Sequence, residues 1–415
     1  MVYRAPLIGL LVAHYLTRFG NGITIVAVPL YVLTRTHSAM AAGSAGAASA
    51  VPLIIAGFGG GVFIDRLGLR QSSILADCVA GFLTCAVPFL DQLMTLPLPA
   101  LFVLLFVRSL LSTPGNVARR GMLPELAQRA GAVKDTANTW FSLAPRLALV
   151  LGPSVAGLLV ATVGAVNTLY LDAASFFVSA SLVLCLVPRV ERSAREHARS
   201  LLREMEAGVR FVFGQPVLRA LLGTLSMTNL VDEAFAPVLF PVFALAVLGN
   251  SADVGWLLAA NGVGAVIGTV LYIPAGRRVQ HIRWLVFFGC FGVVAVCRFA
   301  MAGLPALWLA AAITFIFGVA SGPLNPIINT LLQDATPEHL RGRVFGAFSA
   351  TAYGAAPVGI MIAGWLVGVL GLRWIFLAYG ALYIGTIVIA GRSRTLRASL
   401  SHVPTPEASR ALTPW

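Results

Sequence analysis

Charged side chains are scarce in this sequence, and acidic residues and lysine are the scarcest. Charged residues make up 11% of the 415 residues, with 16 Asp and Glu against 29 Lys and Arg. Lys134 is the only lysine, so the net charge of +13 comes almost entirely from arginine. An ordinary soluble domain has about 25% charged residues. A soluble chain could not hide a hydrophobic content of 58% in one core, so the composition excludes an ordinary soluble protein.

The sequence also lacks the motifs of nucleotide-driven and hydrolytic enzymes. It contains no Walker A sequence, no H-E-x-x-H and no G-x-S-x-G. Any transport would therefore be driven by an ion gradient or run downhill, and we expect no enzymatic activity, no cofactor and no bound metal. Five cysteines lie inside apolar runs, as small buried hydrophobes do, rather than at disulfide or metal-ligand spacing: Cys78, Cys85, Cys185, Cys290 and Cys297.

Long apolar runs fill most of the chain. A run of about 20 apolar residues predicts a transmembrane helix, because a helix bonds its own backbone groups where lipid cannot. We therefore predict an all-α membrane protein with twelve transmembrane helices in two pseudo-symmetric six-helix bundles. The predicted spans are residues 7–34, 40–64, 72–93, 97–117, 139–163, 166–188, 217–247, 254–275, 284–303, 305–328, 344–370 and 372–391.

The arginines between the spans indicate the orientation. With both termini cytoplasmic, the outside segments carry only Arg35 and Arg373, and nearly all other arginines between spans lie inside. We therefore expect a multi-pass protein of the cytoplasmic membrane in contact with the lipid bilayer. This topology explains the basic charge without a nucleic-acid partner. We expect a monomer.

The two halves of the sequence look like repeats. Pro29 in "PLYVL" returns as Pro241 in "PVFAL", and Cys78 and Cys85 return as Cys290 and Cys297 at the same interval. Such repeats are typical of secondary transporters, whose binding site lies between the halves near the bilayer midplane. The predicted division is an N-terminal bundle at 1–188, a cytoplasmic linker with an amphipathic helix at 189–215, a C-terminal bundle at 216–391, and a cytoplasmic tail without order at 392–415.

Two equivalent helices carry polar stripes within their apolar runs. Helical spacing places these side chains on one face, which we expect to line a central cavity. A charge within a span costs about 2.5–3.5 kcal/mol and needs a reason. The stripe residues are His14, Thr17, Arg18, Asn21 and Thr24 in the first helix, and Ser226, Asn229, Asp232 and Glu233 in the seventh.

The buried carboxylates are the candidates for proton coupling. Burial disfavours the charged form of a carboxylate, so such a group can take up a proton, and a cationic substrate would compete for the same anion. Glu233 and Asp232 are the first candidates. Asp172 and Asp77 follow, and an interfacial structural role is equally open for Asp77. The alternative is a structural pair, for example Arg18 with Asp232 or Glu233, that only holds the halves together.

Three further arginines fall within spans. Arg108 and Arg146 either tune a neighbouring acid or form a stable ion pair with it. Arg298 lies near a helix end, where its side chain could reach the membrane surface. In "LGPSVAG", Pro153 can kink the fifth helix, and Gly152 and Gly157 permit close approach of a neighbour. This segment is either a bending point for alternating access or a packing site.

One loop resembles a known signature. "GVFIDRLGLR" is similar to the G-x-x-x-D-R-x-G-R-[RK] loop of the major facilitator superfamily, although Leu69 stands where a basic residue is usual. The resemblance implies that this loop takes part in conformational switching, and that Arg108 matches the buried fourth-helix arginine of the family. "LGPSVAG" resembles the fifth-helix antiporter motif, with Ala148 and Ala156 replacing glycines. The matching loop residues are Gly61, Asp65, Arg66, Gly68 and Arg70.

Two longer segments narrow the resemblance. "LLQDATPEHLRGRVFG" and "LYLDAASFFVSA" are similar to the drug–proton antiporter branch, and within it to Tap-type multidrug efflux pumps. Those pumps often have an acid in the first helix where this chain has Asn21, which shifts the expected proton site to the seventh helix. The resemblance implies proton-coupled efflux of hydrophobic, often cationic drugs.

Two alternative functions remain open. An exporter of one metabolite, such as an anionic siderophore or a lipid, would need Arg18 and Arg146 exposed, whereas cationic drugs would need a free Asp232 or Glu233. A non-transporting scaffold or receptor is a different class, which the repeats and the buried charges disfavour.

Overall fold

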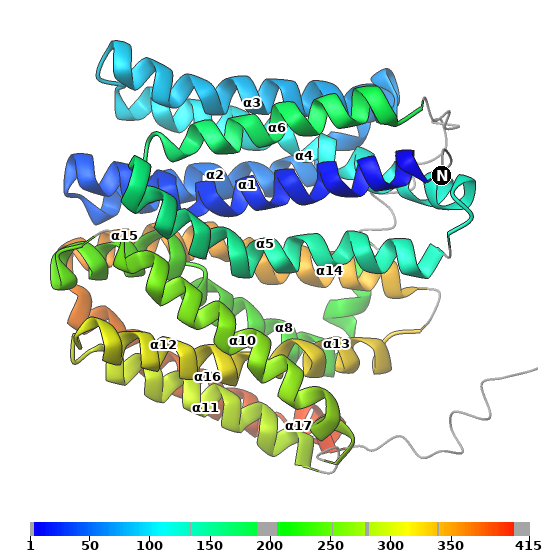
Figure 1. The fold of residues 1–415 in the computed structure, drawn as a ribbon. Helices are drawn as coiled ribbons and strands as arrows, with labels where there is room; N and C mark the ends of the chain where they lie inside the picture. The colour runs from blue at the N-terminus through cyan, green and yellow to red at the C-terminus, as the bar shows by residue number, and fades with distance from the viewer. Residues whose placement is uncertain are drawn as a thin grey trace, which may run out of the picture.

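The fold is a set of long helices that run side by side (Figure 1). The computed structural model describes residues 4–132, 134–188, 206, 208–250, 252–278, 282–337 and 340–401. Within these residues the chain is helical and contains no strand. The N-terminal half lies above the C-terminal half in Figure 1. We call the end of the molecule at which the first helix begins the proximal end, and the opposite end the distal end.

Six helices form the N-terminal half, and each corresponds to one predicted span. The fourth extends well beyond its predicted end at residue 117, so Arg119 and Arg120, expected in a loop, lie on the helix. Arginine is a good helix former, and charge alone does not end a helix. The helices are α1 (Ala5–Thr36), α2 (Ala39–Leu67), α3 (Leu69–Leu93), α4 (Leu98–Arg129), α5 (Lys134–Val163) and α6 (Thr168–Leu186).

The C-terminal half contains interrupted spans. The seventh span changes from α-helix to π-helix after Glu233, in a segment where Pro237 and Pro241 have no backbone N–H to donate. π-Helical turns often mark functional sites. The tenth and eleventh spans also break in two. The elements are α8 (Pro216–Asp232), η1 (Phe235–Leu239), α9 (Phe240–Phe243), η2 (Ala244–Leu248), α10 (Asp253–Arg278), α11 (Arg283–Met301), α12 (Leu307–Ser321), α13 (Leu324–Asp334), α14 (Arg341–Gly354), α15 (Ala356–Leu370) and α16 (Leu372–Arg392).

The observed helices fit the predicted membrane topology. Ten helices or helix pairs in the described part of the chain are long and apolar enough to cross a membrane. With α2 and α5, which have 29 and 30 residues, the count reaches the twelve predicted spans. Of the linker at 189–215, residues 189–205 and 207 lie outside the described part of the chain, and residues 208–214 are helical.

The segment after α16 is more ordered than the sequence analysis expected. A short helix, α17 (Arg394–Ser401), packs against α8, α11 and α16. Leu396 and Leu400 are fully buried there, and the Arg397 guanidinium lies 4.9 Å from the centroid of the Trp284 ring. The expectation of a tail without order is therefore wrong for residues 394–401, because leucines four positions apart give this helix one apolar face.

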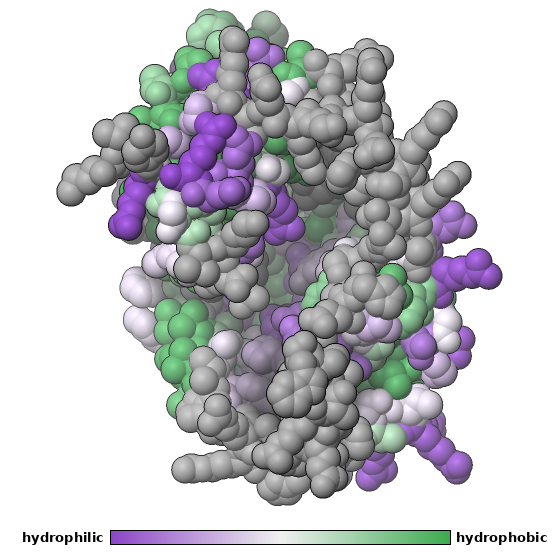
Figure 2. Space-filling view, turned by 90° about the vertical axis from the view of Figure 1, so that its right-hand side faces the viewer, coloured by the Kyte–Doolittle hydropathy of each residue, from purple (hydrophilic) through white to green (hydrophobic). Residues whose placement is uncertain are grey.

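The two halves touch through α2 with α15, through α5 with α10, and through α1 with η1 and α9. Glycines allow the first two contacts. A Cβ added to Gly157 would lie 2.1 Å from the Cα of Gly255, and one added to Gly43 would lie 3.2 Å from the Cα of Gly364. All four glycines lie in the distal parts of their helices. Figure 2, which faces the proximal end, shows a hollow between the halves. The halves are therefore closed distally and open proximally.

Candidate functional site

A buried ion pair in the N-terminal half joins α4 to α6. Arg108 Nη2 lies 2.5 Å from Asp172 Oδ2, and both side chains are almost fully buried. Arg108 also donates to Asn21 on α1 at 2.9 Å and to Thr84 on α3 at 2.7 Å, and Thr24 donates to Asp172. Four helices thus meet at one charge pair. The predicted residues Arg108, Asp172 and Asn21 come together, in the ion-pair arrangement that the sequence analysis left open.

The packing around this pair leaves no room for a larger neighbour. A Cβ added to Gly20 would lie 2.2 Å from Asp172 Oδ1, so glycine at this position makes space for the carboxylate. On the other side, the Arg108 guanidinium carbon lies 5.2 Å from the centroid of the Phe176 ring, within cation–π range. A buried pair held on all sides in this way is a rigid joint between helices.

A second buried pair lies closer to the proximal end. Arg119 Nη1 lies 2.6 Å from Asp77 Oδ2, which also accepts a hydrogen bond from Ser179 at 2.6 Å. Arg119 donates to Thr17 at 3.2 Å. The sequence analysis missed Arg119, although it lies about three helical turns after Arg108 on the same face of α4. Asp77 is fully buried and engaged by Arg119 and Ser179.

The corresponding pair in the C-terminal half uses other helices. Arg298 Nη2 on α11 lies 2.7 Å from Asp232 Oδ1 on α8, and Tyr383 on α16 donates to the other carboxylate oxygen. The guanidinium carbon of Arg298 lies 3.4 Å and 4.1 Å from the ring centroids of Phe235 and Phe317. Arg298 is 2% exposed, so the expectation that it reaches the membrane surface is wrong: an acid and two aromatic rings hold it inside.

The three polar residues in the middle of the seventh span have different surroundings. Asn229 donates to the Ala352 carbonyl on α14 at 3.1 Å. Asp232 points into its own half, toward Arg298 and Tyr383. Glu233 is exposed and has no hydrogen bond or ion pair with any residue that the structure describes. Its carboxylate is within electrostatic range of Asp232 and of Tyr353 on α14.

The position of Glu233 follows from the exposure along its helix. In α8 the exposed residues Arg219, Gly223 and Met227 follow one another four residues apart, and Glu233 is exposed six residues after Met227, nearer to the side of the helix on which Arg219 lies. Directly after Glu233, η1 and α9 are buried against α1, and η1 also packs on α2. The exposed residues of α8 therefore end at Glu233, beside the segment that packs against the other half.

The first-helix stripe divides in a similar way. His14 is buried and stacks on the Phe141 ring, with 3.8 Å between centroids. Arg18 is partly exposed and has no ion pair with a described residue, and its Nε has no hydrogen-bond partner. The suggested pairing of Arg18 with Asp232 or Glu233 is therefore absent from the described contacts, since Arg298 takes Asp232.

Part of the loop and antiporter motifs falls outside the described side chains, namely Gly61, Asp65, Arg66, Arg146 and Pro153. Two loop residues are described. Gly68 has a φ of 80°, which favours glycine, and Arg70 Nη2 donates to the Leu184 carbonyl of α6 at 2.6 Å.

The glycines of the fifth helix are described as well. A Cβ added to Gly152 would lie 2.9 Å from the Cα of Gly22 on α1, within the same half. Gly157 instead meets Gly255 of the other half. The close-approach interpretation of these two glycines is thus supported by their neighbours, because a side chain at either position would push two helices apart.

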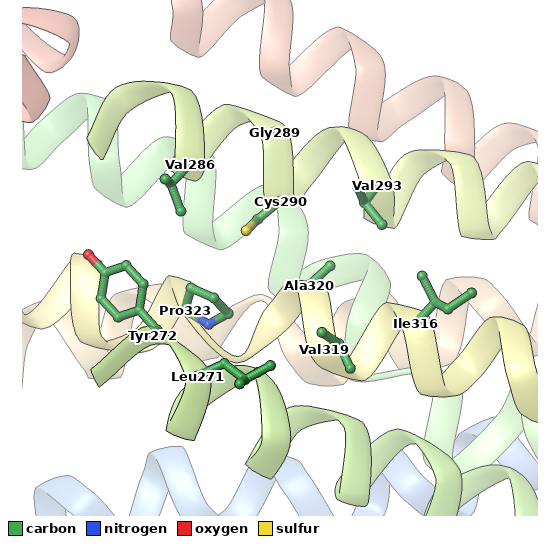
Figure 3. A pocket seen from close by; sticks show the side chains of 11 residues that line it. Leu271, Tyr272, Val286, Gly289, Cys290, Val293, Ile316, Val319, Ala320 and Pro323 are labelled. Atoms are coloured by element: carbon green, nitrogen blue, oxygen red, sulfur yellow. The ribbon is translucent and has the colours of Figure 1, made fainter. Parts of the chain in front are cut away.

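A separate apolar cavity of about 480 Å³ lies among α10, α11 and α12 (Figure 3). Val286, Cys290 and Val293 approach it from α11, and Val319 and the other lining residues carry no charge. None of the polar groups described above lines it. It therefore offers mainly apolar surface, with the Tyr272 hydroxyl and the Cys290 thiol but no carboxylate or basic side chain.

Comparisons with known proteins agree with this architecture. The family model described as Major Facilitator Superfamily matches residues 10–356 and 225–415. The multidrug efflux pump Tap of Mycolicibacterium fortuitum is 34% identical over 93% of this chain and 95% of the pump. The enterobactin exporter EntS of Escherichia coli is 27% identical over 85% of this chain and 83% of the exporter. The crystal structure of the nucleoside transporter NupG has a TM-score of 0.71 at 13% identity, covering 96% of this chain and 99% of that one.

Proposed function

The chain belongs to the Major Facilitator Superfamily and is a multi-pass membrane transporter, and from that premise we propose that it exports hydrophobic, often cationic drugs in exchange for protons. The observation that carries the proposal is Glu233, a carboxylate without a partner among the described residues, beside the segment that packs against the other half. The similarity to the multidrug efflux pump Tap along nearly the whole chain supports drugs as the substrate class.

The proposed setting is the cytoplasmic membrane, with both termini and the proximal end facing the cytoplasm. The arginine distribution between spans supports this orientation. Residues 1–188 and 216–391 act as two rigid six-helix units, 189–215 links them on the cytoplasmic side, and 392–415 forms the cytoplasmic tail. The transporter works as a monomer surrounded by lipid, with a small-molecule substrate and protons as its partners.

Glu233 is suited to bind either a proton or a cation. Its carboxylate is exposed and has no partner among the described residues, so it can take up a proton or pair with a cation. A cationic drug arriving from the cytoplasm displaces the proton, and a proton arriving from outside displaces the drug. This exclusive occupancy makes transport an antiport.

The buried ion pairs have a different role in the proposal. Asp232, Asp172 and Asp77 each have an arginine within 2.7 Å. An acid held in this way is occupied by its arginine and is unavailable to the drug. We assign these pairs to holding each half rigid, so that the halves move as bodies about the cavity. Arg108 acts in coupling only through this rigidity.

Movement of the halves exposes the cavity to each side in turn. The distal contacts at Gly157 with Gly255 and at Gly43 with Gly364 close the outer side while the proximal hollow is open. In the opposite state these contacts separate and the proximal ends of the helices meet. The signature loop with Gly68 and Arg70 lies at the proximal end, where it holds α3 against α6.

A dedicated metabolite exporter is the second candidate function. Arg18 has no acidic partner among the described residues, which suits an anionic substrate, and the similarity to the enterobactin exporter supports a substrate of that kind. Such an exporter would transport one anionic compound and neglect cationic drugs.

Transport in inverted membrane vesicles with an imposed pH gradient tests the proposal. Wild-type vesicles should accumulate a cationic dye only when the gradient is present. Glu233→Gln should lose this gradient-driven accumulation, whereas Glu125→Gln, at an exposed carboxylate paired with Arg129, should keep it. Gradient-driven accumulation that survives in Glu233→Gln would remove this residue from the mechanism. Transport of a siderophore but of no cationic dye would favour the second candidate.

A further inference from the structure

Arg18 is a cation at membrane depth that no acid in the described part of the chain neutralises. It lies in the middle of α1, and no residue in the described part of the chain pairs with it. Its Nε is buried without a hydrogen-bond partner. A charged side chain without a partner in a transmembrane helix costs free energy, so such side chains face a partner or a water-filled space. The proposed drug–proton exchange makes no use of Arg18.

The exposed part of the Arg18 side chain faces the space between the halves. Helix α1 packs against α2, α4, α5 and α6 of its own half, and against η1 and α9 of the other half. Helix α1 therefore lies between the other helices of its own half and the segment η1 and α9 of the other half. Beyond residue 21 it is buried almost continuously up to Leu33. Arg18 therefore lies just proximal to the point where the halves close.

Arg18 and Glu233 lie at similar depths on opposite walls. By the repeat that relates Pro29 to Pro241, Glu233 corresponds to Asn21, which is about one helical turn distal to Arg18. Both positions lie where the exposed proximal part of their helix gives way to the buried distal part. The hollow thus has an unpaired cation on its N-terminal wall and an unpaired anion on its C-terminal wall.

The surroundings of Arg18 strengthen its positive field. Arg119 and Arg120 on α4 both lie within electrostatic range of it. Asp77 compensates Arg119, but Arg120 is exposed and contacts the Phe141 ring at 5.7 Å rather than an acid. His14 stacks on the same Phe141 ring and adds no negative charge. An anionic group entering the hollow is therefore attracted to this wall.

We propose that the cavity recognises amphoteric substrates, with Arg18 binding a carboxylate or similar anionic group while Glu233 binds the cationic group of the same molecule. The guanidinium of an arginine offers paired N–H donors that match a carboxylate. This inference rests on the proposed function and names its substrate class: apolar molecules that carry both charges rather than cations alone.

Binding of two matched dyes to the purified full-length protein tests the proposal. A rhodamine is used as its methyl ester, which is a cation, and as its free carboxylic acid, which has both charges. The wild type should bind the acid more tightly than the ester. Arg18→Gln should weaken binding of the acid by about 10- to 100-fold, as expected for a lost charge-assisted hydrogen bond, and change the ester by less than about twofold. Arg18→Lys should restore most of the loss, because it keeps the positive charge.

The control variant is Arg373→Gln, which removes an exposed arginine at the distal start of α16 and should change neither dye. Equal weakening of both dyes by Arg18→Gln would show a structural role and overturn the proposal, as would unchanged binding of the acid. Vesicle transport is measured separately. If the wild type binds both dyes as predicted but moves neither, export fails while the recognition by Arg18 stands. If it moves the ester but binds the acid no better, recognition fails while export stands.

Discussion

Each half of the molecule contains a buried ion pair near its centre, but different helices supply the two pairs. In the N-terminal half Asp172 comes from α6 and its arginine from α4, whereas in the C-terminal half Asp232 comes from α8 and its arginine from α11. By the spacing that relates Pro29 to Pro241, Gly20 corresponds to Asp232. The glycine makes room for an acid from another helix, and its counterpart supplies the acid itself. A duplicated unit has thus kept the pair and moved its members.

The two halves also differ in the charge that remains unpaired. The N-terminal half leaves Arg18 without an acid among the described residues, and the C-terminal half leaves Glu233 without a base. The three buried pairs each lie within one half, whereas Arg18 and Glu233, which have no described partner, lie on two spans that contact the other half. An ion-pair partner therefore distinguishes the charged residues that hold each half together from those that are available to a substrate.

The largest expected effect is the loss of one partner of a buried pair. Arg298→Met leaves Asp232 without its cation, and Arg108→Met leaves Asp172 without its own. Each should lower the stability by about 3–5 kcal/mol, the usual cost of an uncompensated buried charge. Thermal unfolding of the purified protein, followed by tryptophan fluorescence, would show the fall in melting temperature.

A double variant distinguishes the effect of losing the ion pair from the effect of losing side-chain volume. Arg298→Met combined with Asp232→Leu should recover most of the lost stability, because two apolar side chains need no partner. By contrast, Glu233→Gln should leave the melting temperature nearly unchanged. A melting temperature for Glu233→Gln as low as that of Arg298→Met would erase the distinction between paired and unpaired charges.

An intermediate effect is expected where the halves touch. Gly157→Val places side-chain atoms where Gly255 lies, an overlap that typically costs about 1–3 kcal/mol. The distal ends of α5 and α10 should move apart, as spin-label distances between them would show. Gly368→Val is the matched control, since nothing lies within 4 Å of an added Cβ there. Equal distances in both variants would mean that the glycine contact does not close the distal side.

The smallest effect is expected at α17, which ties three helices of the C-terminal half together. Leu400→Ala removes a fully buried side chain and should cost about 2 kcal/mol. Ser399→Ala, one position earlier and only partly exposed, should change little. The midpoint of thermal unfolding measures both, and a loss of stability that is equal in the two variants would contradict packing by the buried face of α17.

The sequence predicted the helices and the polar stripes because periodicity and apolar length are local properties. The repeat and the span count could be expected in this way. Pairings between helices could not, since they depend on which faces meet in three dimensions. Arg298 was expected at the membrane surface because its partners Asp232 and Tyr383 are remote in sequence.

Residues at the predicted helix ends were the other source of error. Arg119 was placed in a loop because charge normally ends an apolar run, yet Asp77 and Ser179 satisfy it inside the bundle. The π-helical turns after Glu233 have no clear sequence signal apart from Pro237 and Pro241. The exposed residues of α8 end at these turns, so the surroundings of Glu233 could be derived only from the structure.

Proton movement driven by substrate tests the central claim most directly. Liposomes containing the purified transporter and a pH-sensitive dye are given an outward gradient of a cationic drug, and the internal pH is followed. The account predicts that drug efflux through the wild type drives proton uptake, and that Glu233→Gln abolishes the proton signal and also weakens exchange of drug for drug, because the drug and the proton share this carboxylate. A proton signal of wild-type size in Glu233→Gln would contradict the assignment of the unpaired carboxylate as the proton carrier.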